Sequence, residues 1–251
     1  MKKQLLSVAV CGAMALAMFG CSQAPNPKAE GDAPAQQEQP AAAEKSPEEL
    51  KSELVDLING QATNVTVDTS TDTTVSAQGQ SFTQSMDILA MVDNADGYKG
   101  YAKITAPGTE MDGMETFMDG SKAVVRLGDQ TVDISDEMAD ELDDSMGVDN
   151  EKAIAIVNAA KEISVSESNG QKTYTVVTDG ASAAGVDFDG VDSVGDIDAT
   201  YVFDSSDQLV KNTMSVEGTT TTQGQEVTVK VDVTADYSDY GTTQVPAVPE
   251  A

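Results

Sequence analysis

The chain has no histidine and no tryptophan, and its two cysteines are Cys11 and Cys21. Without histidine, the Ser-His-Asp triad, the Cys-His pair and the common zinc sites are all excluded. With no tryptophan and only six tyrosines, a glycosidase is also disfavoured, although carboxylate pairs are plentiful. The sequence therefore predicts no catalytic residues and no enzyme.

Basic residues are scarce. The chain has 14 Lys and Arg against 43 Asp and Glu, which gives a net charge of −29 in 251 residues. A protein that binds nucleic acid neutralises phosphates with clustered cations, and no segment here carries a basic stripe. We therefore expect no nucleic-acid partner. Valine and threonine are frequent instead, and both suit a pleated, half-buried surface, so the pattern favours strands over general disorder.

Residues 1–20 have the pattern of an export signal. Two lysines precede an apolar run at 5–19, which is too short to span a bilayer comfortably. The run ends in Gly20-Cys21, which resembles the lipobox of bacterial lipoproteins, although Met18 and Phe19 depart from its usual residues. Such a signal implies that Cys21 is lipidated and becomes the first residue. Ordinary secretion with a cut after Ala17 is the alternative.

The segment at 21–45 reads as a tether. It is rich in Ala, Pro, Gln and Glu and has no apolar period, so it cannot bury a face of its own. A disordered spacer directly behind a lipidated cysteine would hold a domain away from the membrane. The folded domain is predicted to occupy 46–249.

That domain is predicted to open with a helix at 46–59. Ser46-Pro47-Glu48-Glu49 combines a capping residue, a proline at the first helical position and the glutamate of a capping box. Apolar residues then share one helical face and are expected to be buried. They are Leu50, Leu54, Leu57 and Ile58.

After Gly60 the apolar period changes to two, which indicates strands. The predicted strands lie near 82–92, 98–104, 122–127, 164–166, 173–178, 209–216 and 227–233. Asn169-Gly170 is the strongest hairpin signal, because both residues tolerate positive φ. Gln-Gly-Gln occurs at 78–80 and at 223–225, which indicates two similar long hairpins. They are either an internal repeat or two hairpins that share one turn chemistry.

Two further helices are predicted among the strands, at 135–142 and at 150–163. The stretch at 179–198 is rich in Gly and Asp and is expected to lack regular structure, as a lid would. The order of elements predicts an α+β domain, a curved antiparallel half-barrel sheet with helices packed on its concave face.

The ending Tyr237-Ser238-Asp239-Tyr240-Gly241, followed by Val245-Pro246, is similar to the end of LppX-type domains. Together with the lipobox, the tether and the opening helix, it resembles the LolA/LppX-like fold of bacterial lipoproteins over about 46–249. This resemblance implies a LolA-like half-barrel whose hydrophobic cavity, between sheet and helices, holds a lipid or acyl chain.

A ligand in such a cavity would contact apolar residues of the helices and strands, and several of the candidates are methionines, which adapt to varied ligands. The alternative is that these residues simply fill the core. The predicted ligand-binding residues are Leu54, Ile58, Met86, Ile88, Phe117, Met118, Val157, Phe188, Tyr201, Phe203 and Met214.

No cofactor and no metal is expected. Calcium at the 187–192 loop is the one metal alternative, because Asp187, Asp189 and Asp192 surround a glycine, but the spacing is not that of an EF-hand. The sequence thus predicts a lipoprotein of the cell membrane, lipid-anchored on the extracytoplasmic face. Its partners would be a lipid or other amphiphile, or alternatively an envelope protein.

The lipid anchor can be tested by Cys21→Ser. Without the thiol no acyl chain can be attached, so we expect an unprocessed or differently cut product that leaves the membrane fraction. The measurement is the fractionation and electrophoretic mobility of the variant beside the natural chain. A variant that stays membrane-bound and migrates like the natural chain would show that Cys21 anchors nothing.

Overall fold

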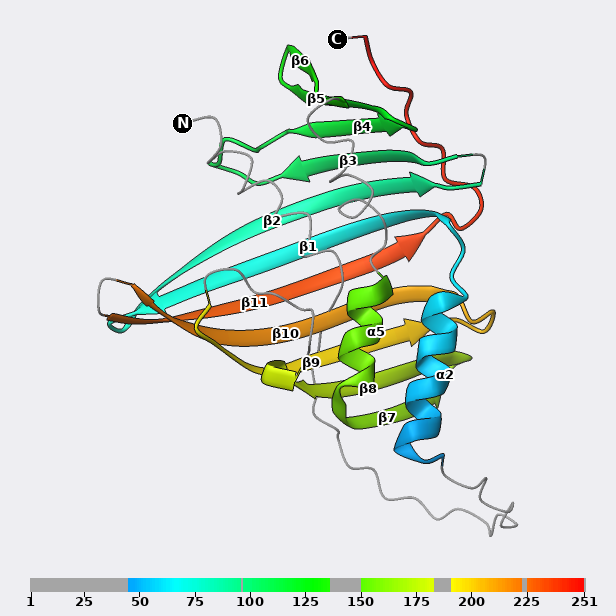
Figure 1. The fold of residues 1–251 in the computed structure, drawn as a ribbon, viewed down its shortest axis with the longest axis vertical. Coiled ribbons are helices and arrows are strands. Elements are labelled where there is room, and N and C mark those ends of the chain that lie inside the picture. Colours follow the sequence, from blue (N-terminus) through cyan, green and yellow to red (C-terminus); the bar gives the residue numbers. More distant parts are fainter. Residues whose placement is uncertain (1–44, 96, 136–149, 183–190, 223–224, 251) are drawn as a thin grey trace, which may run out of the picture.

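The computed structural model describes residues 45–95, 97–135, 150–182, 191–222 and 225–250. Within these residues, eleven antiparallel strands form one sheet in the order β6-β5-β4-β3-β2-β1-β11-β10-β9-β8-β7. Two meanders, β1–β6 and β7–β11, thus join where the first strand pairs with the last. Figure 1 shows the sheet curving, with two helices on one face at the β7–β10 end. The predicted α+β half-barrel with helices on its concave face is confirmed.

The first meander starts from two long strands and ends in short ones. Its strands are β1 (Asn64–Ala77), β2 (Gln80–Asp93), β3 (Lys99–Thr105), β4 (Glu115–Asp119), β5 (Lys122–Leu127) and β6 (Gln130–Asp133). The second meander holds β7 (Ala160–Ser168), β8 (Gln171–Asp179), a short 3-10 helix η1 (Gly180–Ser182), β9 (Ser193–Phe203), β10 (Leu209–Thr222) and β11 (Gln225–Ser238).

Helix α2 (Pro47–Asn59) begins as the sequence predicts. The Ser46 hydroxyl accepts the amide proton of Glu49, and the Glu49 carboxylate accepts that of Ser46, which completes the capping box. The hydrogen bonds that the Glu49 carboxylate accepts from the amide and the hydroxyl of Ser46 hold the pKa of Glu49 below its ordinary value. Leu50, Leu54 and Ile58 are buried as expected, and Leu57 is half-buried against the same core.

Two sequence predictions fail in the second meander. The helix predicted at 150–163 ends earlier, as α5 (Asn150–Asn158), and Ala160 already starts β7. The reason is the hairpin at Asn169-Gly170, whose register continues through Ile163 opposite Val176 to Ala160 opposite Thr178. Cross-strand pairing therefore overrides the local helical preference. The helix predicted at 135–142 lies, after its first residue, outside the described residues.

The prediction that the stretch at 179–198 lacks regular structure is partly wrong as well. Its end, from Ser193 onward, is strand β9, and Gly180–Ser182 form η1. The pairing with β10 is irregular between Val216 and Gly218. Acidic residues, a glycine and this bulge interrupt the alternation, so the strand has no clear period in the sequence.

The two long hairpins match each other closely. All four of their strands, β1, β2, β10 and β11, have 14 residues. In the β1–β2 turn, Gln78 and Gly79 both adopt positive φ. Asn169 and Gly170 do the same in the shorter β7–β8 hairpin, so both turns have the predicted chemistry. The hairpins lie side by side in the sheet because β1 pairs with β11 over its length.

The main core lies between the two helices and the inner side of the sheet. It combines α2 and α5 with residues of β1, β2 and β7–β11. Leu54 of α2 and Ile156 of α5 are completely buried there, as are Tyr174 of β8 and Phe203 of β9, whose rings meet edge to face at 5.9 Å.

Leu54→Ala is expected to lower the free energy of unfolding by ~2–5 kcal/mol, because it removes a fully buried side chain from a packed core. Leu57→Ala, on the same helix but half-buried, is the matched control and should cost about 1 kcal/mol. Denaturant unfolding of both variants measures the difference. Equal, small losses would mean that α2 is only loosely docked.

Candidate functional site

The sheet has two chemically different faces. Residues that lie opposite one another in the strand register point to the same face, and the face toward the helices is called the inner face below. Its positions on the five central strands are Val65, Val67, Thr69, Thr71 and Thr73 of β1; Gln84, Met86, Ile88, Ala90 and Val92 of β2; Val231, Val233, Ala235 and Tyr237 of β11; Asn212, Met214 and Val216 of β10; and Ile197, Ala199 and Tyr201 of β9.

None of these described inner-face positions carries a charge, in a chain with 57 charged residues counted as 14 basic and 43 acidic. The alternate positions of the same strands include Asp68 and Asp72 of β1, Asp87 of β2 and Asp232 and Asp236 of β11. Since an unpaired charge is costly to remove from water, the inner face suits apolar or neutral partners, whereas the outer face keeps the protein soluble.

Six of the predicted ligand-binding residues come together in the main core. They are Leu54, Ile58, Val157, Tyr201, Phe203 and Met214. The structure separates the others. Ile88 and the half-buried Met86 belong to a second cluster with residues of β3 and its following loop, and Met118 belongs to a third with Ala123.

Phe117 is buried on the other face of β4. It lies opposite Tyr101 in the register, with ring centroids 5.1 Å apart, and the Arg126 guanidinium carbon stands 5.0 Å from its ring centre. Phe117 is therefore not joined with the inner-face residues. Phe188 lies outside the described residues.

A small cleft opens where α2 ends above β1 and β11. Its volume is about 140 Å³, below the ~300–1,000 Å³ typical of small-molecule sites. The floor is apolar and the rim polar. It is lined by Ile58, Gln61, Ala62, Thr63, Val65, Val92, Asn94, Asn150, Leu209, Tyr237 and Tyr240. Of the predicted ligand-binding residues that the structure describes, Ile58 alone lines this cleft.

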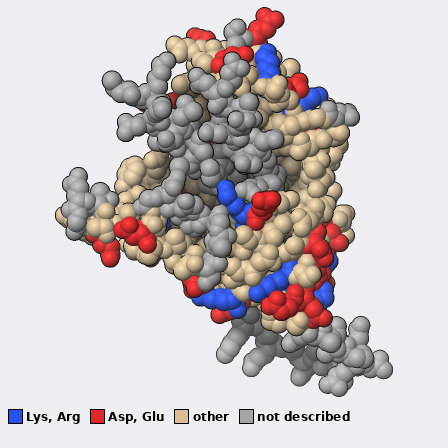
Figure 2. All heavy atoms as spheres, in the orientation of Figure 1, with Lys and Arg blue, Asp and Glu red and all other residues tan. Residues whose placement is uncertain are grey.

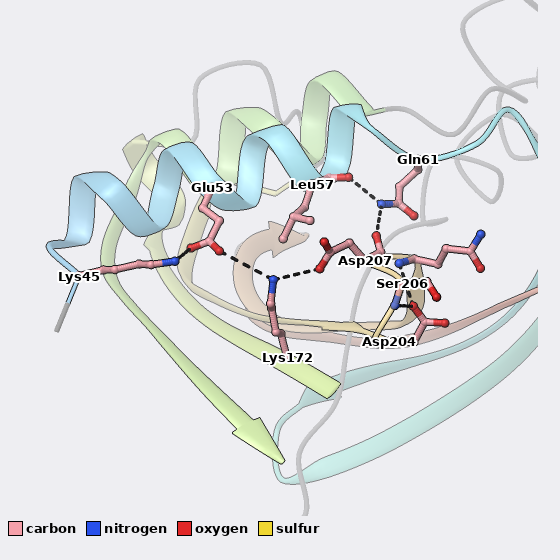
Figure 3. A network of polar contacts seen from close by, with 9 residues as sticks. Lys45, Glu53, Leu57, Gln61, Lys172, Asp204, Ser206 and Asp207 are labelled. Carbon is pink, nitrogen blue, oxygen red and sulfur yellow. Dashed lines mark hydrogen bonds and ion pairs between the residues drawn. The ribbon is translucent and has the colours of Figure 1, made fainter. Parts of the chain in front are cut away.

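Gln61 fixes the rim of the cleft. Its side-chain nitrogen donates to the carbonyl oxygens of Leu57 at 2.6 Å and Asp207 at 3.1 Å, and its side-chain oxygen accepts the amide proton of Leu209 at 2.8 Å. Figure 3 shows the two bonds that the Gln61 nitrogen donates, between the end of α2 and the β9–β10 turn. One side chain thus ties the helix to a turn that is distant in sequence.

The turn that Gln61 holds is ordered from within. The Asp204 carboxylate accepts the amide protons of Ser206 at 2.8 Å and Gln208 at 3.0 Å, and Asp207 has a positive φ of 58°. On the other side of the cleft, the Tyr240 hydroxyl donates to the Leu209 carbonyl at 2.7 Å. Burial raises the pKa of Tyr240, so the phenol remains a donor. Hydrogen bonds therefore hold the walls of the cleft on both sides.

An ion-pair chain borders the same turn. Glu53 of α2 pairs with Lys45 and lies 4.0 Å from Lys172 of β8, which pairs with Asp207 at 2.9 Å (Figure 3). The hydrogen bond from Lys45 holds the pKa of Glu53 below its ordinary value. Figure 2 shows charges of both signs gathered where β7, β8 and the start of α2 lie. Such partly exposed pairs contribute little to stability.

Glu115, a further carboxylate with a lowered pKa, belongs to a structural cluster. Glu115 of β4 accepts a hydrogen bond from the Tyr101 hydroxyl at 2.7 Å and another from Arg126 Nε at 2.8 Å. These two bonds, that of Tyr101 foremost, lower the pKa of Glu115. With its oxygens engaged on both sides, Glu115 acts as a cross-strand link.

In the described part of the chain, no group of three or more Cys, Asp or Glu side chains could hold a metal ion. Of the calcium alternative, residues 187–190 lie outside the described residues, and the Asp192 carboxylate accepts the amide proton of Thr221 at 2.7 Å. Among the described residues, no helix is long and apolar enough to cross a membrane.

No family model matches the sequence, and no curated protein does. Solved structures do match. LprF from Mycobacterium bovis is 13% identical with a TM-score of 0.43, over 82% of this chain and 99% of that one. LppX from Mycobacterium tuberculosis is 15% identical with a TM-score of 0.36, over 80% of this chain and 100% of that one.

A LolA superfamily protein from Nitrosomonas europaea is 12% identical with a TM-score of 0.27, over 80% of this chain and 94% of that one. The chain is similar to these structures, and the likeness is one of fold alone. At such identities and scores it carries no statement about ligand, activity or partner.

Sequence reasoning missed Gln61, Tyr240 and Asn150 as parts of the cleft. Each makes its contact across a long sequence separation, such as Asn150 Nδ2 to the Ile58 carbonyl at 3.4 Å. A polar residue just after a helix carries no local signal for such a bond. Tyr240 lies in the terminal motif that is similar to the end of LppX-type domains, and this motif was its signal in the sequence.

Gln61→Ala should lower the free energy of unfolding by about 2 kcal/mol, because it leaves the Leu209 amide and two carbonyls without their partner. Gln80→Ala, at an exposed position with no such bonds, is the matched control and should change stability by less than about 0.5 kcal/mol. Denaturant unfolding gives both values. Indistinguishable variants would show that Gln61 does not fix the cleft.

Proposed function

We propose that this protein is a membrane-anchored, extracytoplasmic lipoprotein that binds a lipid or other amphiphile between the inner face of the sheet and the helices, for carriage or for sensing. The observation that carries the proposal is the inner face itself. In a chain of net charge −29, the inner positions of the five central strands are free of charge. A cleft with an apolar floor opens at the end of that face, beside α2.

The cleft alone would hold only part of an amphiphile, since its volume is about 140 Å³. Its floor, with Val65 and Val92, suits the apolar portion of such a ligand. Burying about 300 Å² of apolar ligand surface would contribute ~7 kcal/mol before the costs of association. No covalent step and no catalysis is part of the proposal.

A second function is favoured by a specific observation. Phe82 near the tip of the β1–β2 hairpin is 66% exposed, and its cross-strand neighbour Val75 is 36% exposed. The main core, by contrast, is well filled, with Leu54 and Phe203 wholly buried. A filled core with an exposed apolar edge is what an envelope protein-interaction or sensor module would have, with no small-molecule ligand.

Titration with the fluorescent apolar probe N-phenyl-1-naphthylamine separates the two functions. We expect saturable binding by the natural chain. Val92→Phe, which places a larger side chain in the floor of the cleft, should weaken binding about tenfold or more. Leu89→Phe, on the outer face of the same strand, should leave binding unchanged.

Thermal unfolding of both variants serves as the control for an intact fold. Absence of saturable binding by the natural chain would refute amphiphile binding and leave the interaction module. Equal binding by both variants would place the ligand elsewhere.

A further inference from the structure

Polar side chains interrupt the apolar inner face at its centre. Thr69 of β1 lies between Ile88 of β2 and Ala235 of β11, and Asn212 of β10 lies on the far side of Ala235. Thr71, the next inner position along β1, lies in the neighbouring row. The three polar residues, Thr69, Thr71 and Asn212, are called the polar patch below.

Each member of the polar patch has a buried atom without a partner. Thr69, Thr71 and Asn212 are 0%, 4% and 1% exposed, and among the described residues Thr69 Oγ1, Thr71 Oγ1 and Asn212 Oδ1 accept or donate no hydrogen bond. Asn212 Nδ2 is already engaged, since it donates to the Thr200 carbonyl at 3.3 Å. Buried polar groups are rarely left so, because each forfeits its bonds to water.

Other buried threonines of this chain are satisfied. Thr178, also wholly buried, donates to the Ile156 carbonyl at 2.9 Å, and Thr66 on the outer face of β1 pairs with Thr243 at 3.0 Å. Among the described threonines, a buried hydroxyl without a hydrogen bond is therefore not general. Thr69 and Thr71 hold successive inner positions of β1, and Asn212 lies in the same row as Thr69.

The chemistry of the polar patch specifies its partner. A threonine hydroxyl can donate or accept, whereas the Asn212 side-chain oxygen can only accept. Two positions apart on one strand are separated by roughly 7 Å, and two strands apart by roughly 10 Å. A partner that satisfies all three atoms must therefore carry several polar atoms, at least one of which donates a hydrogen to Asn212, such as a hydroxyl. No inner-face position of the central strands supplies a cation for a carboxylate or phosphate.

We propose that Thr69, Thr71 and Asn212 form a subsite for the uncharged, oxygen-bearing head of the bound amphiphile, such as the hydroxyls and ester carbonyl of a glycerol ester. One threonine hydroxyl donates to the ester carbonyl oxygen and the other bonds a ligand hydroxyl, while Asn212 accepts from a ligand hydroxyl. Met86 and Met214 flank Thr71 and Val233 in the same row, and their flexible side chains accommodate the adjoining apolar chain. This assignment rests on the proposed function.

The test uses the full chain and displacement of N-phenyl-1-naphthylamine by three competitors: 1-monooleoylglycerol, oleate and 1-octadecene. The natural chain should bind 1-monooleoylglycerol more tightly than oleate or 1-octadecene. The double variant Thr69→Val, Thr71→Val, which keeps the side-chain shape, should lose about 5- to 30-fold in affinity for the monoglyceride and little for octadecene. An unchanged monoglyceride affinity, or a preference for oleate, overturns the subsite while the proposed function stands. No displaceable binding of the probe overturns both.

Thermal unfolding without ligand supplies a second, independent readout. Because the double variant removes hydroxyls that lack partners, its melting temperature should equal or exceed that of the natural chain. Thr66→Val, which breaks the bond to Thr243 on the opposite face of the same strand, is the matched control and should melt lower with unchanged binding. A lower melting temperature of the double variant would show that water already satisfies these hydroxyls, and would overturn the subsite.

Discussion

The pairing of β1 with β11 is the contact on which the rest of the structure depends. Each of the two meanders is built from neighbours in sequence, but the meanders meet only along this pair in the described sheet. The pairing runs from Thr66 opposite Ser238 to Ser76 opposite Thr228, so it joins the beginning of the domain to its end. Such a non-local contact loses loop-closure entropy before the packing that stabilises it has formed. We therefore expect this step to limit the rate of folding.

The same pairing creates the surface that we assign to the ligand. It places the inner positions of β1 beside those of β11, so that the inner faces of the two hairpins form one uncharged surface. A slip of the register by one residue would bring Asp68 or Asp232 onto this inner face. The acidity of the chain thus acts against wrong registers, because each would bury carboxylates that no cation of the inner face can pair.

Local chemistry was the predictable part of the fold. The capping box at Ser46 and the turn at Asn169-Gly170 each depend on a few neighbouring residues, and both were confirmed. The predicted end of the helix at 163 was wrong because β8 recruits Ile163 by a contact that helical periodicity cannot reveal. For the candidate site, the helical periodicity predicted that Ile58 is buried. The roles of Gln61 and the polar patch depend on contacts with residues distant in sequence. Their residue types alone would place them on an ordinary wet surface.

The topology also determines which strands end the sheet. Since the first and last strands are central, the edges are β6, with four residues, and β7, which carries Lys161, Glu162 and Glu167 along an exposed strand. A short edge and a charged edge both disfavour the addition of a strand from another molecule. If the chain is tethered to a membrane, as its amino-terminal sequence predicts, many copies share one surface at high local concentration. The edges of this sheet would then keep the crowded copies from polymerising through their backbones.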